Sequence, residues 1–413
     1  MSDAYVLGVG RTAYGRFPDR SVGALAGEAL GLCLADAGVA PRDIGAVFFA
    51  NATQGALEGQ HLIRGQIALR AGGITGVPVF NVENACASGA TALHLAATAV
   101  RAGETDLALA LGAEKMHGAD AARTREAFHG GMDVARWESE LKALRDAAGA
   151  AVPAEGAARC SWTSTPRSPR TTCGATPPAR PAARRGHRQE PRHGSLNPLA
   201  THRTPLTLDE VLAAREIVPP LTLPMCAPIG DGAAAALVCS PAAARRLGAR
   251  RAVRIRASVV ASGSGRTLDD DARQITRRAS ATAYERAGLG PADISLAEVH
   301  DATAIGEVLQ LEALGLVPAG DGAAAAERGE TALGGRLPVN TSGGLECNGH
   351  PVGATGIGQV HELVGQLRGE AGARQVPGAR VALAENGGGF LGYEEAAAAV
   401  VVLEAPGTAG RRP

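Results

Sequence analysis

The chain has 413 residues, of which 45% are hydrophobic and 20% charged, so it can bury one large core or several ordinary ones. Lysine plus arginine and aspartate plus glutamate number 41 each, and aromatic residues make up 3% of the chain. This composition excludes a basic surface that follows nucleic acid and an aromatic platform that stacks on bases.

Apolar stretches alternate with amphipathic stretches along most of the chain. In the first part, strands are predicted at 4–10, 44–51, 77–83 and 105–116, and helices at 21–38 and 88–103. In the second part, strands are predicted at 254–263, 294–301, 337–342, 380–386 and 396–404, and helices at 272–288 and 356–372. Short buried strands separated by helical stretches predict an α/β protein with a buried sheet.

The two parts share one unit, in which a strand is followed by a glycine-rich turn and a helix. Residues 77–103 form this unit in the first part, and residues 337–372 form it in the second. Two similar halves are expected to pack as a pseudo-twofold pair, which places equivalent turns beside each other. Cys86 in the first turn is therefore expected close to His350 in the second.

Residues 160–191 differ from the rest, because they are rich in proline and arginine and have no apolar periodicity. They are interpreted either as a flexible basic linker or as the product of two compensating frameshifts. Translated back and shifted by two bases, the segment can encode LVDVDAAIAADYMRR, an amphipathic helix, and the normal frame resumes at RHGSLNPLA. We favour the frameshift, because chance rarely produces such a periodicity.

Cys86 lies between a predicted strand and a predicted helix. A helix N-terminus offers free N–H groups and the positive end of the dipole, which favour thiolate over thiol and suit a nucleophile. An isolated cysteine is, however, more commonly a small buried hydrophobe. His350 sits in a GHP sequence among glycines, which hold the backbone in a tight path before a helix. It is placed to accept the Cys86 proton as a general base.

Several motifs in order resemble the thiolase superfamily, in particular its sterol-carrier-protein-type thiolase and acetyl-CoA acetyltransferase branch. They are NACASGATAL (84–93), GDGAAAALV (230–238), EVHDATAIGEVLQLEALG (298–315) and NTSGGLECNGHPVGATG (340–356). The resemblance covers almost the whole chain apart from 160–191. It implies the thiolase fold, with two pseudo-twofold-related halves in a five-layer α/β/α/β/α arrangement.

The same resemblance implies a division of the chain. Residues 1–118 with about 222–248 would form the N-terminal half, and residues 249–405 the C-terminal half. Residues 119–221 would form a loop domain over the active site, and residues 406–413 a tail.

The resemblance also implies an acyltransferase that acts on coenzyme A thioesters. Cys86 would become acylated after activation by His350, in a Claisen condensation or in thiolytic cleavage of a 3-oxoacyl-CoA. His300 would polarise a thioester carbonyl, although a strand-end histidine bonded to backbone is the alternative. The backbone N–H groups of Cys86 and of Gly387, in ENGGGFLG, would hold the acyl-enzyme oxygen. We expect neither a resident cofactor nor a metal. We expect a homodimer or a homotetramer.

One part of the family pattern is missing. Thiolases use a second acid/base, usually a cysteine, for the proton on the α-carbon, but the two positions for it are occupied by Glu385 and Ala302. Glu385 and Cys347 are candidate replacements, and double duty by one of the two histidines is a third alternative.

The missing cysteines keep two other functions open. One is a thiolase-like retro-aldolase that cleaves β-hydroxyacyl-CoA and works with a small OB-fold partner; the retained Cys86 argues against it. The other is a degenerate, non-catalytic thiolase homologue, in which the altered segment 160–191 abolishes substrate binding.

The remaining features concern location and cysteine chemistry. No apolar run reaches the length of about 18 residues that a membrane helix needs, and the N-terminal residues lack the pattern of a signal peptide. We therefore expect a cytoplasmic protein without membrane contact. The seven cysteines are scattered and lack paired C-x-x-C spacing, so neither a disulfide framework nor a zinc site is expected.

Overall fold

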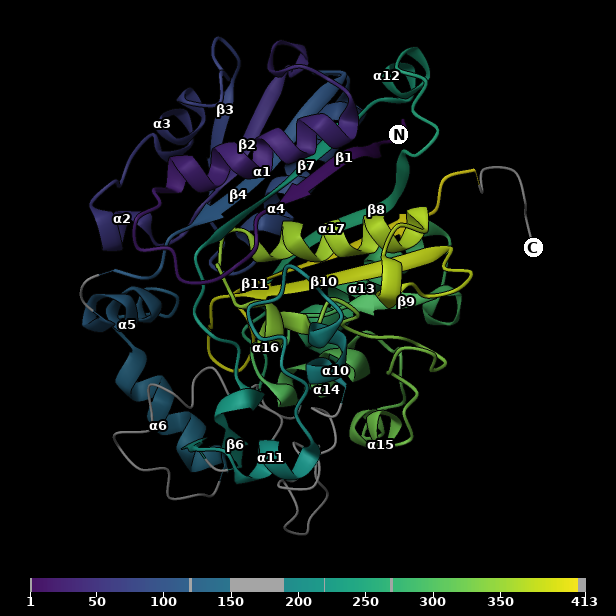
Figure 1. Ribbon diagram of the computed structural model, residues 1–413. Coiled ribbons are helices and arrows are strands. Elements are labelled where there is room, and N and C mark those ends of the chain that lie inside the picture. The colour runs from purple at the N-terminus through teal and green to yellow at the C-terminus, as the bar shows by residue number, and fades with distance from the viewer. Residues whose placement is uncertain (1, 119–120, 149–188, 219, 268–269, 408–413) are drawn as a thin grey trace.

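The computed structural model describes residues 2–118, 121–148, 189–218, 220–267 and 270–407 (Figure 1). The strands are β1 (Tyr5–Arg11), β2 (Ala46–Ala50), β3 (Val79–Val82), β4 (Leu107–Glu114), β5 (Glu216–Val218), β6 (Leu221–Thr222), β7 (Gly232–Cys239), β8 (Val253–Ser262), β9 (Leu296–Glu298), β10 (Val381–Gly388) and β11 (Ala397–Glu404). The helices are α1 (Val22–Ala37), α2 (Gln54–Glu58), α3 (Arg64–Arg70), α4 (Ser88–Ala102), α5 (Ala121–His129), α6 (Trp137–Ala148), α10 (Glu190–Ser195), α11 (Leu208–Ala213), α12 (Pro241–Arg246), α13 (Ile275–Ala287), α14 (Ala304–Ala313), α15 (Gly322–Glu327), α16 (Gly344–Asn348) and α17 (Thr355–Arg368).

Nine strands pair in the order β3-β2-β4-β7-β1-β8-β11-β10-β9, which divides into two similar groups. In the first group β3, β2 and β4 are parallel, and β7 and β1 are added antiparallel. The second group repeats this order in reverse, with β9 parallel to β10 and with β11 and β8 added antiparallel. The groups meet where β1 pairs with β8 through Tyr5 and Val6. This symmetry is the predicted pseudo-twofold relation.

The helices complete a five-layer arrangement, as predicted. α1 covers the outer face of the first group of strands, and α13 covers the outer face of the second. α4 and α17 pack against each other between the two groups, as Figure 1 shows for α17. Their apolar faces, such as Leu93 on α4 and Ile357 on α17, share one core with both groups of strands. The helix N-termini that follow Cys86 and His350 therefore lie in the same central layer.

A short motif before β2 and β9 also repeats. A 3₁₀ turn at Pro41–Asp43 precedes β2, and another at Pro291–Asp293 precedes β9. In each turn the aspartate carboxylate accepts the N–H of the residue before the proline, at 2.8 Å for Asp43 and 2.7 Å for Asp293. The two halves therefore start these equivalent strands with the same local hydrogen bond.

The structure differs from the prediction at residues 337–342, where a strand was expected. Val339 forms an isolated parallel bridge with Ala297 at the outer edge of β9. The chain then turns, because Asn340 and Gly343 have φ values of 49° and 96°. The bridge takes the place that β3 has in the first group, so its position in the repeat is retained.

The segment between β4 and β7 contributes α5, α6, α10, α11 and the β5–β6 hairpin. Figure 1 places α5, α6 and α11 to one side of the nine paired strands. Most of the segment for which a frameshift is predicted, residues 160–188, lies outside the described residues. Its last residues, 189–191, lie at the start of α10.

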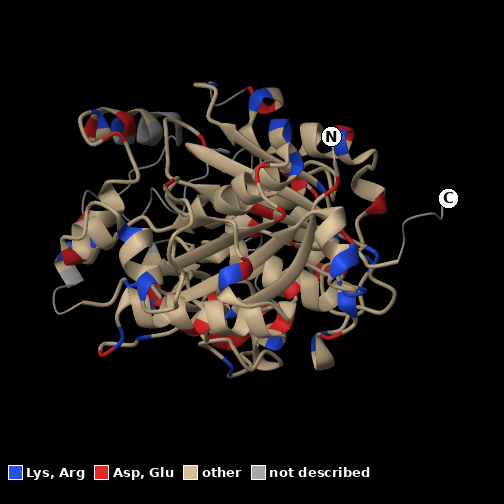
Figure 2. Cartoon of the chain, turned by 90° about the horizontal axis from the view of Figure 1, so that it is seen from above, with Lys and Arg blue, Asp and Glu red and all other residues tan. Residues whose placement is uncertain are grey.

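Charged residues of both signs are interspersed over the molecule when it is seen from above (Figure 2). None of the described helices is both long and apolar enough to cross a membrane.

Candidate active site

Cys86 lies in a tight turn between β3 and α4. The preceding residue, Ala85, has a φ of 47°, an unusual left-handed conformation for a residue with a side chain. The Ser88 hydroxyl fixes this turn, because it accepts the N–H of Asn84 at 2.8 Å and donates to the carbonyl of Ala85 at 2.6 Å. The sequence thus places Cys86 at the junction of a strained turn and a helix N-terminus.

His350 reaches the same place from the other half of the fold. Its Nε2 lies 3.0 Å from the Cys86 Sγ, which is the proximity that the repeat predicts. The Thr355 hydroxyl donates to the carbonyl of Pro351 at 3.1 Å and contacts Nδ1 of His350 at 2.8 Å. Because that hydroxyl proton is already used, Nδ1 donates to Thr355 and Nε2 is left as an acceptor for the thiol proton.

The electrostatics of this pair differ from the sequence-based expectation of a thiolate. Burial, followed by the nearby charge of Glu114, raises the pKa of the Cys86 thiol, and the N–H groups of Gly389 and Cys86 lower it by less. Burial and the neighbouring His300 hold the pKa of His350 well below its ordinary value. The resting pair is therefore a neutral thiol and a neutral imidazole, because desolvation outweighs the helix dipole.

His300 lies edge-on to His350, with 5.1 Å between ring centroids. The Asn386 amide donates to Nδ1 of His300 at 3.0 Å, which leaves the other ring nitrogen, Nε2, to carry the proton. Burial lowers the pKa of His300 to about 4, so the ring is neutral. A neutral imidazole with one free N–H is suited to donate a hydrogen bond to a carbonyl oxygen.

The glycine run after Asn386 packs directly against the nucleophile turn. A Cβ on Gly388 would lie 2.3 Å from the Asn84 oxygen and 2.4 Å from the Ala87 nitrogen, so a side chain is sterically excluded. The N–H of Gly389 contributes a hydrogen bond to the Cys86 sulfur. Gly387, the residue selected from the sequence, lies inside β10 with its Cα against Glu395.

Glu114 at the end of β4 connects the two halves beneath the site. Its buried carboxylate accepts five hydrogen bonds at 2.7–3.1 Å, from Asn51, Ala52, Gly353 and both the N–H and the hydroxyl of Thr53. Burial raises the pKa of Glu114, and these donors lower it. Since Gly353 belongs to the turn after His350, Glu114 fixes that turn to the first half.

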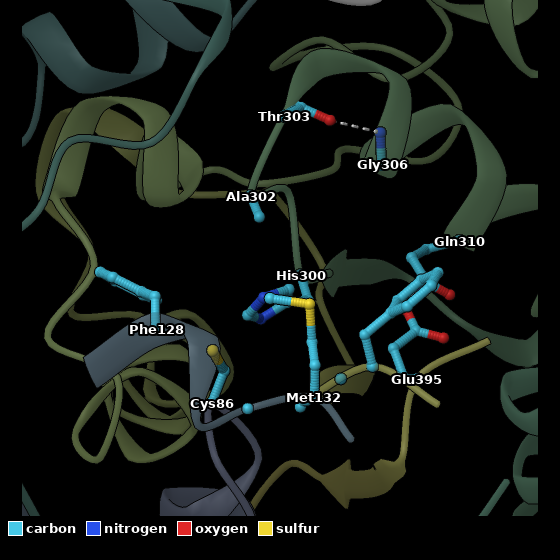
Figure 3. A pocket seen from close by; sticks show the side chains of 14 residues that line it. Cys86, Phe128, Met132, His300, Ala302, Thr303, Gly306, Gln310 and Glu395 are labelled. Atoms are coloured by element: carbon cyan, nitrogen blue, oxygen red, sulfur yellow. Dashed lines mark hydrogen bonds between the residues drawn. The ribbon is translucent and has the colours of Figure 1, made fainter. Parts of the chain in front are cut away.

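A cavity of about 70 Å³ lies beside Cys86 and His300 (Figure 3). Cys86, His300 and Glu395 line it, together with residues of the segments 128–132, 302–310 and 387–390. Within the described part of the chain, Cys86, His300 and His350 are also the one group of potential metal ligands whose donor atoms all lie within 4.8 Å of one another. Two imidazoles and a thiol can bind zinc, but their hydrogen bonds also suit proton transfer.

The N-terminal and C-terminal parts of the chain each match the profile of a known protein family. The family profile "Thiolase, N-terminal domain" matches residues 4–149, and "Thiolase C-terminal domain-like" matches residues 259–404. The chain belongs to the thiolase family.

Individual thiolase relatives agree with this assignment. An acetyl-CoA acetyltransferase of Methanothermobacter thermautotrophicus is 37% identical over 95% of this chain and 98% of its own. Sterol carrier protein 2 of Rattus norvegicus is 34% identical over 92% of this chain and 69% of its own. The benzoylsuccinyl-CoA thiolase subunit BbsB of Thauera aromatica is 33% identical over 93% of this chain and 94% of its own.

A solved structure shows the same fold in a different enzyme. The structure described as "Ltp2-ChsH2(DUF35) aldolase" aligns with a TM-score of 0.72, covers 98% of both chains and is 23% identical.

The candidates for the second thiolase acid/base lie in different surroundings. Glu385 is completely buried, and its Oε2 accepts the backbone N–H of His300 at 3.0 Å. Cys347 packs against Gly194, and burial raises its pKa well above the ordinary value. Neither is among the described residues that line the cavity, whereas Ala302 lines it with a methyl group.

Sequence reasoning missed Asn386, Gly389 and Glu395. Asn386 and Gly389 lie in the quoted ENGGGFLG motif, so the motif located the segment but not the role of each residue. Glu395 is the third residue after that motif, and its sequence signal was a glutamate beside a glycine-rich turn.

Proposed function

We propose that the chain is a thiolase-type acyl-CoA C-acyltransferase that works through an acyl-Cys86 intermediate. The observation that carries this proposal is the 3.0 Å contact between the Cys86 Sγ and the His350 Nε2. Nε2 takes the thiol proton as sulfur attacks the thioester carbonyl, and the C–S bond to coenzyme A breaks. The departing coenzyme A sulfur then receives that proton. A second acyl-CoA accepts the acyl group in condensation, and coenzyme A accepts it in thiolysis.

Hydrogen-bond donors around Cys86 complete the proposed chemistry. The His300 Nε2–H would polarise the carbonyl of the acyl-CoA that forms the carbon–carbon bond. The N–H groups of Gly389 and Cys86 would stabilise the oxyanion on the acyl-cysteine, since both lower the pKa of the Cys86 thiol and so favour negative charge there. In this proposal Gly389 replaces Gly387 as the second backbone donor.

The size of the cavity supports a short acyl group. Its volume of about 70 Å³ has room for a few small groups of atoms and not for a long acyl chain. We propose an acetyl-sized group as the acyl donor, with coenzyme A as part of the substrate and not as a resident cofactor.

The proposal extends to a homodimer or homotetramer in the cytoplasm. β3 is an edge strand with Phe80 52% exposed, and Ile63 and Ile67 nearby in sequence are 58% and 48% exposed. An unpaired edge of this kind is a template on which a strand of a second copy can pair. Light scattering after gel filtration measures the assembly directly.

The test of the proposed function is the mass of the intact protein after exposure to acetyl-CoA and to long-chain acyl-CoAs. One acyl group is expected on the wild type and on Cys226→Ala, a control cysteine outside the cavity, and none on Cys86→Ala. Labelling that persists in Cys86→Ala would contradict the proposal. An unlabelled wild type would favour the degenerate homologue.

A retro-aldolase remains the second candidate, favoured by the methyl group of Ala302 where a thiol is expected in the cavity. Such an enzyme would cleave β-hydroxyacyl-CoA without an acyl-cysteine, with a small OB-fold protein as its partner. Aldehyde or ketone release that survives Cys86→Ala, and co-purification of a small partner, would support this candidate over the transferase.

A further inference from the structure

The proposed acyl transfer includes a second proton transfer, besides the one between Cys86 and His350. Before a carbon–carbon bond forms, the α-carbon of the second acyl-CoA must lose a proton, and in thiolysis the same carbon must gain one. Three of the described residues that line the cavity carry side chains with acid/base chemistry of this kind: Cys86, His300 and Glu395. Cys86 is the nucleophile, and Asn386 holds His300 as a hydrogen-bond donor. Glu395 is left for the α-proton.

Glu395 lies in the turn between β10 and β11, next to the glycine run. A Cβ on Gly387 would lie 2.9 Å from the Glu395 Cγ and 3.0 Å from its Oε1, so the carboxyl group packs on the backbone that borders the cavity. The Gln310 amide donates to Oε1 at 2.8 Å. Oε2 is buried and has no hydrogen-bond partner among the described residues. Figure 3 shows Glu395 and Gln310 close together, on the side of the cavity away from Phe128.

The surroundings of Glu395 favour the protonated carboxyl group more than water does, without excluding the ionised form. Burial, and further the charge of Glu394, raises the pKa of Glu395. Its own N–H, Gln310 and the charge of Arg266 act in the opposite direction and keep the ionised form accessible. General acid/base catalysis by a carboxyl group needs this balance.

We propose that Glu395 is the second acid/base of this enzyme, an inference that rests on the proposed acyl transfer. In condensation the Glu395 carboxylate removes the α-proton, and the resulting enolate attacks the carbonyl of acyl-Cys86. A carbon–carbon bond forms, the bond from that carbonyl to Sγ breaks, and Cys86 leaves as a thiolate. The proton on Glu395 then passes to solvent while the thiolate takes up a proton, so the cycle closes without net proton change. In thiolysis the Glu395 carboxyl group protonates the α-carbon as the carbon–carbon bond breaks.

Glu385 is the competing carboxyl group, and its surroundings assign it a different task. Its Oε2 accepts the backbone N–H of His300, and it lies behind that residue and not on the cavity wall. Glu385 therefore supports the position of His300, whereas Glu395 shares the cavity with the reacting sulfur.

The experiment compares wild type, Glu395→Gln and the exposed control Glu104→Gln with acetyl-CoA in deuterated water. Three quantities are measured: acetylation of Cys86 by intact mass, deuterium uptake at the acetyl methyl group by NMR, and formation of the condensed thioester. For Glu395→Gln we expect acetylation within about threefold of wild type, with deuterium uptake and condensation reduced about 10²- to 10⁴-fold. Glu104→Gln should match wild type in all three.

The outcomes separate this inference from the proposed function. Wild-type rates of deuterium uptake and condensation in Glu395→Gln would overturn the role of Glu395, even though acetylation of Cys86 is intact. Loss of acetylation in Glu395→Gln with an unchanged thermal midpoint would also overturn it, because Glu395 would then act before the α-proton step. Absence of acetylation in the wild type would refute the acyl transfer itself. Glu395→Asp, which keeps the acid but shortens it, should recover part of the deuterium uptake.

Discussion

Gly388 packs closely against the turn that carries Cys86, so adding one methyl group at Gly388 should slow the reaction of Cys86 strongly. In Gly388→Ala the new Cβ would lie 2.3 Å from the Asn84 oxygen and 2.4 Å from the Ala87 nitrogen, whereas ordinary contacts begin at 3.4 Å. Both neighbours are backbone atoms, so the turn that carries Cys86 has to move by about 1 Å. A displacement of that size at a reacting group costs roughly 100-fold in rate.

The assay is the rate of Cys86 acetylation by acetyl-CoA, followed by intact mass. Gly365→Ala is the matched control, because a Cβ at Gly365, within α17, meets nothing within 4 Å. It should acetylate at the wild-type rate and unfold at a slightly higher temperature, since alanine is favoured over glycine in a helix. Gly388→Ala should lose about 1–3 kcal/mol of stability from overpacking and still fold. Acetylation of Gly388→Ala at the wild-type rate would refute the reasoning.

Three further predictions concern the groups around the reacting pair. Burial raises the pKa of Cys86 and lowers that of His350, so the rate of Cys86 alkylation by iodoacetamide should keep rising from pH 7 to pH 10. A rate that reaches a plateau below pH 8 would indicate a thiolate–imidazolium pair instead. Asn386→Leu removes one hydrogen bond to His300, worth about 1 kcal/mol, and should slow condensation about fivefold with acetylation of Cys86 unchanged; equal slowing of both would contradict the assigned role. Glu114→Gln places an amide donor among five hydrogen-bond donors. The free energy of unfolding in urea should fall by about 3–5 kcal/mol. A fall of less than about 1 kcal/mol would show that the carboxylate is dispensable.

The sequence was most informative where local pattern and repetition agree. The strand, turn and helix around Cys86 and those around His350 occur at equivalent places in two similar halves, so their convergence could be predicted without coordinates. The resemblance to thiolases added His300, which lies edge-on to His350, and its role stays a prediction. The prediction of a strand at 337–342 was wrong, because Asn340 and Gly343 turn the chain after a single β-bridge.

The remaining features of the site depend on packing that no local pattern encodes. The sequence predicted a thiolate at Cys86 from the helix that follows it, but burial and Glu114, which is distant in sequence, decide the protonation state. Glu395 enters the cavity because a hairpin folds it back over Gly387, and glutamate in a polar turn is otherwise unremarkable. The predicted frameshift stays a prediction, since residues 160–188 lie outside the described part.

The contact between Cys86 and His350 joins residues 264 positions apart, and this separation bears on how the protein is made. A ribosome synthesises the nucleophile early and its base only near the end of translation. Until then the sulfur has no imidazole to remove its proton. In the proposed mechanism, acyl transfer therefore begins only after the C-terminal half has docked on the N-terminal half.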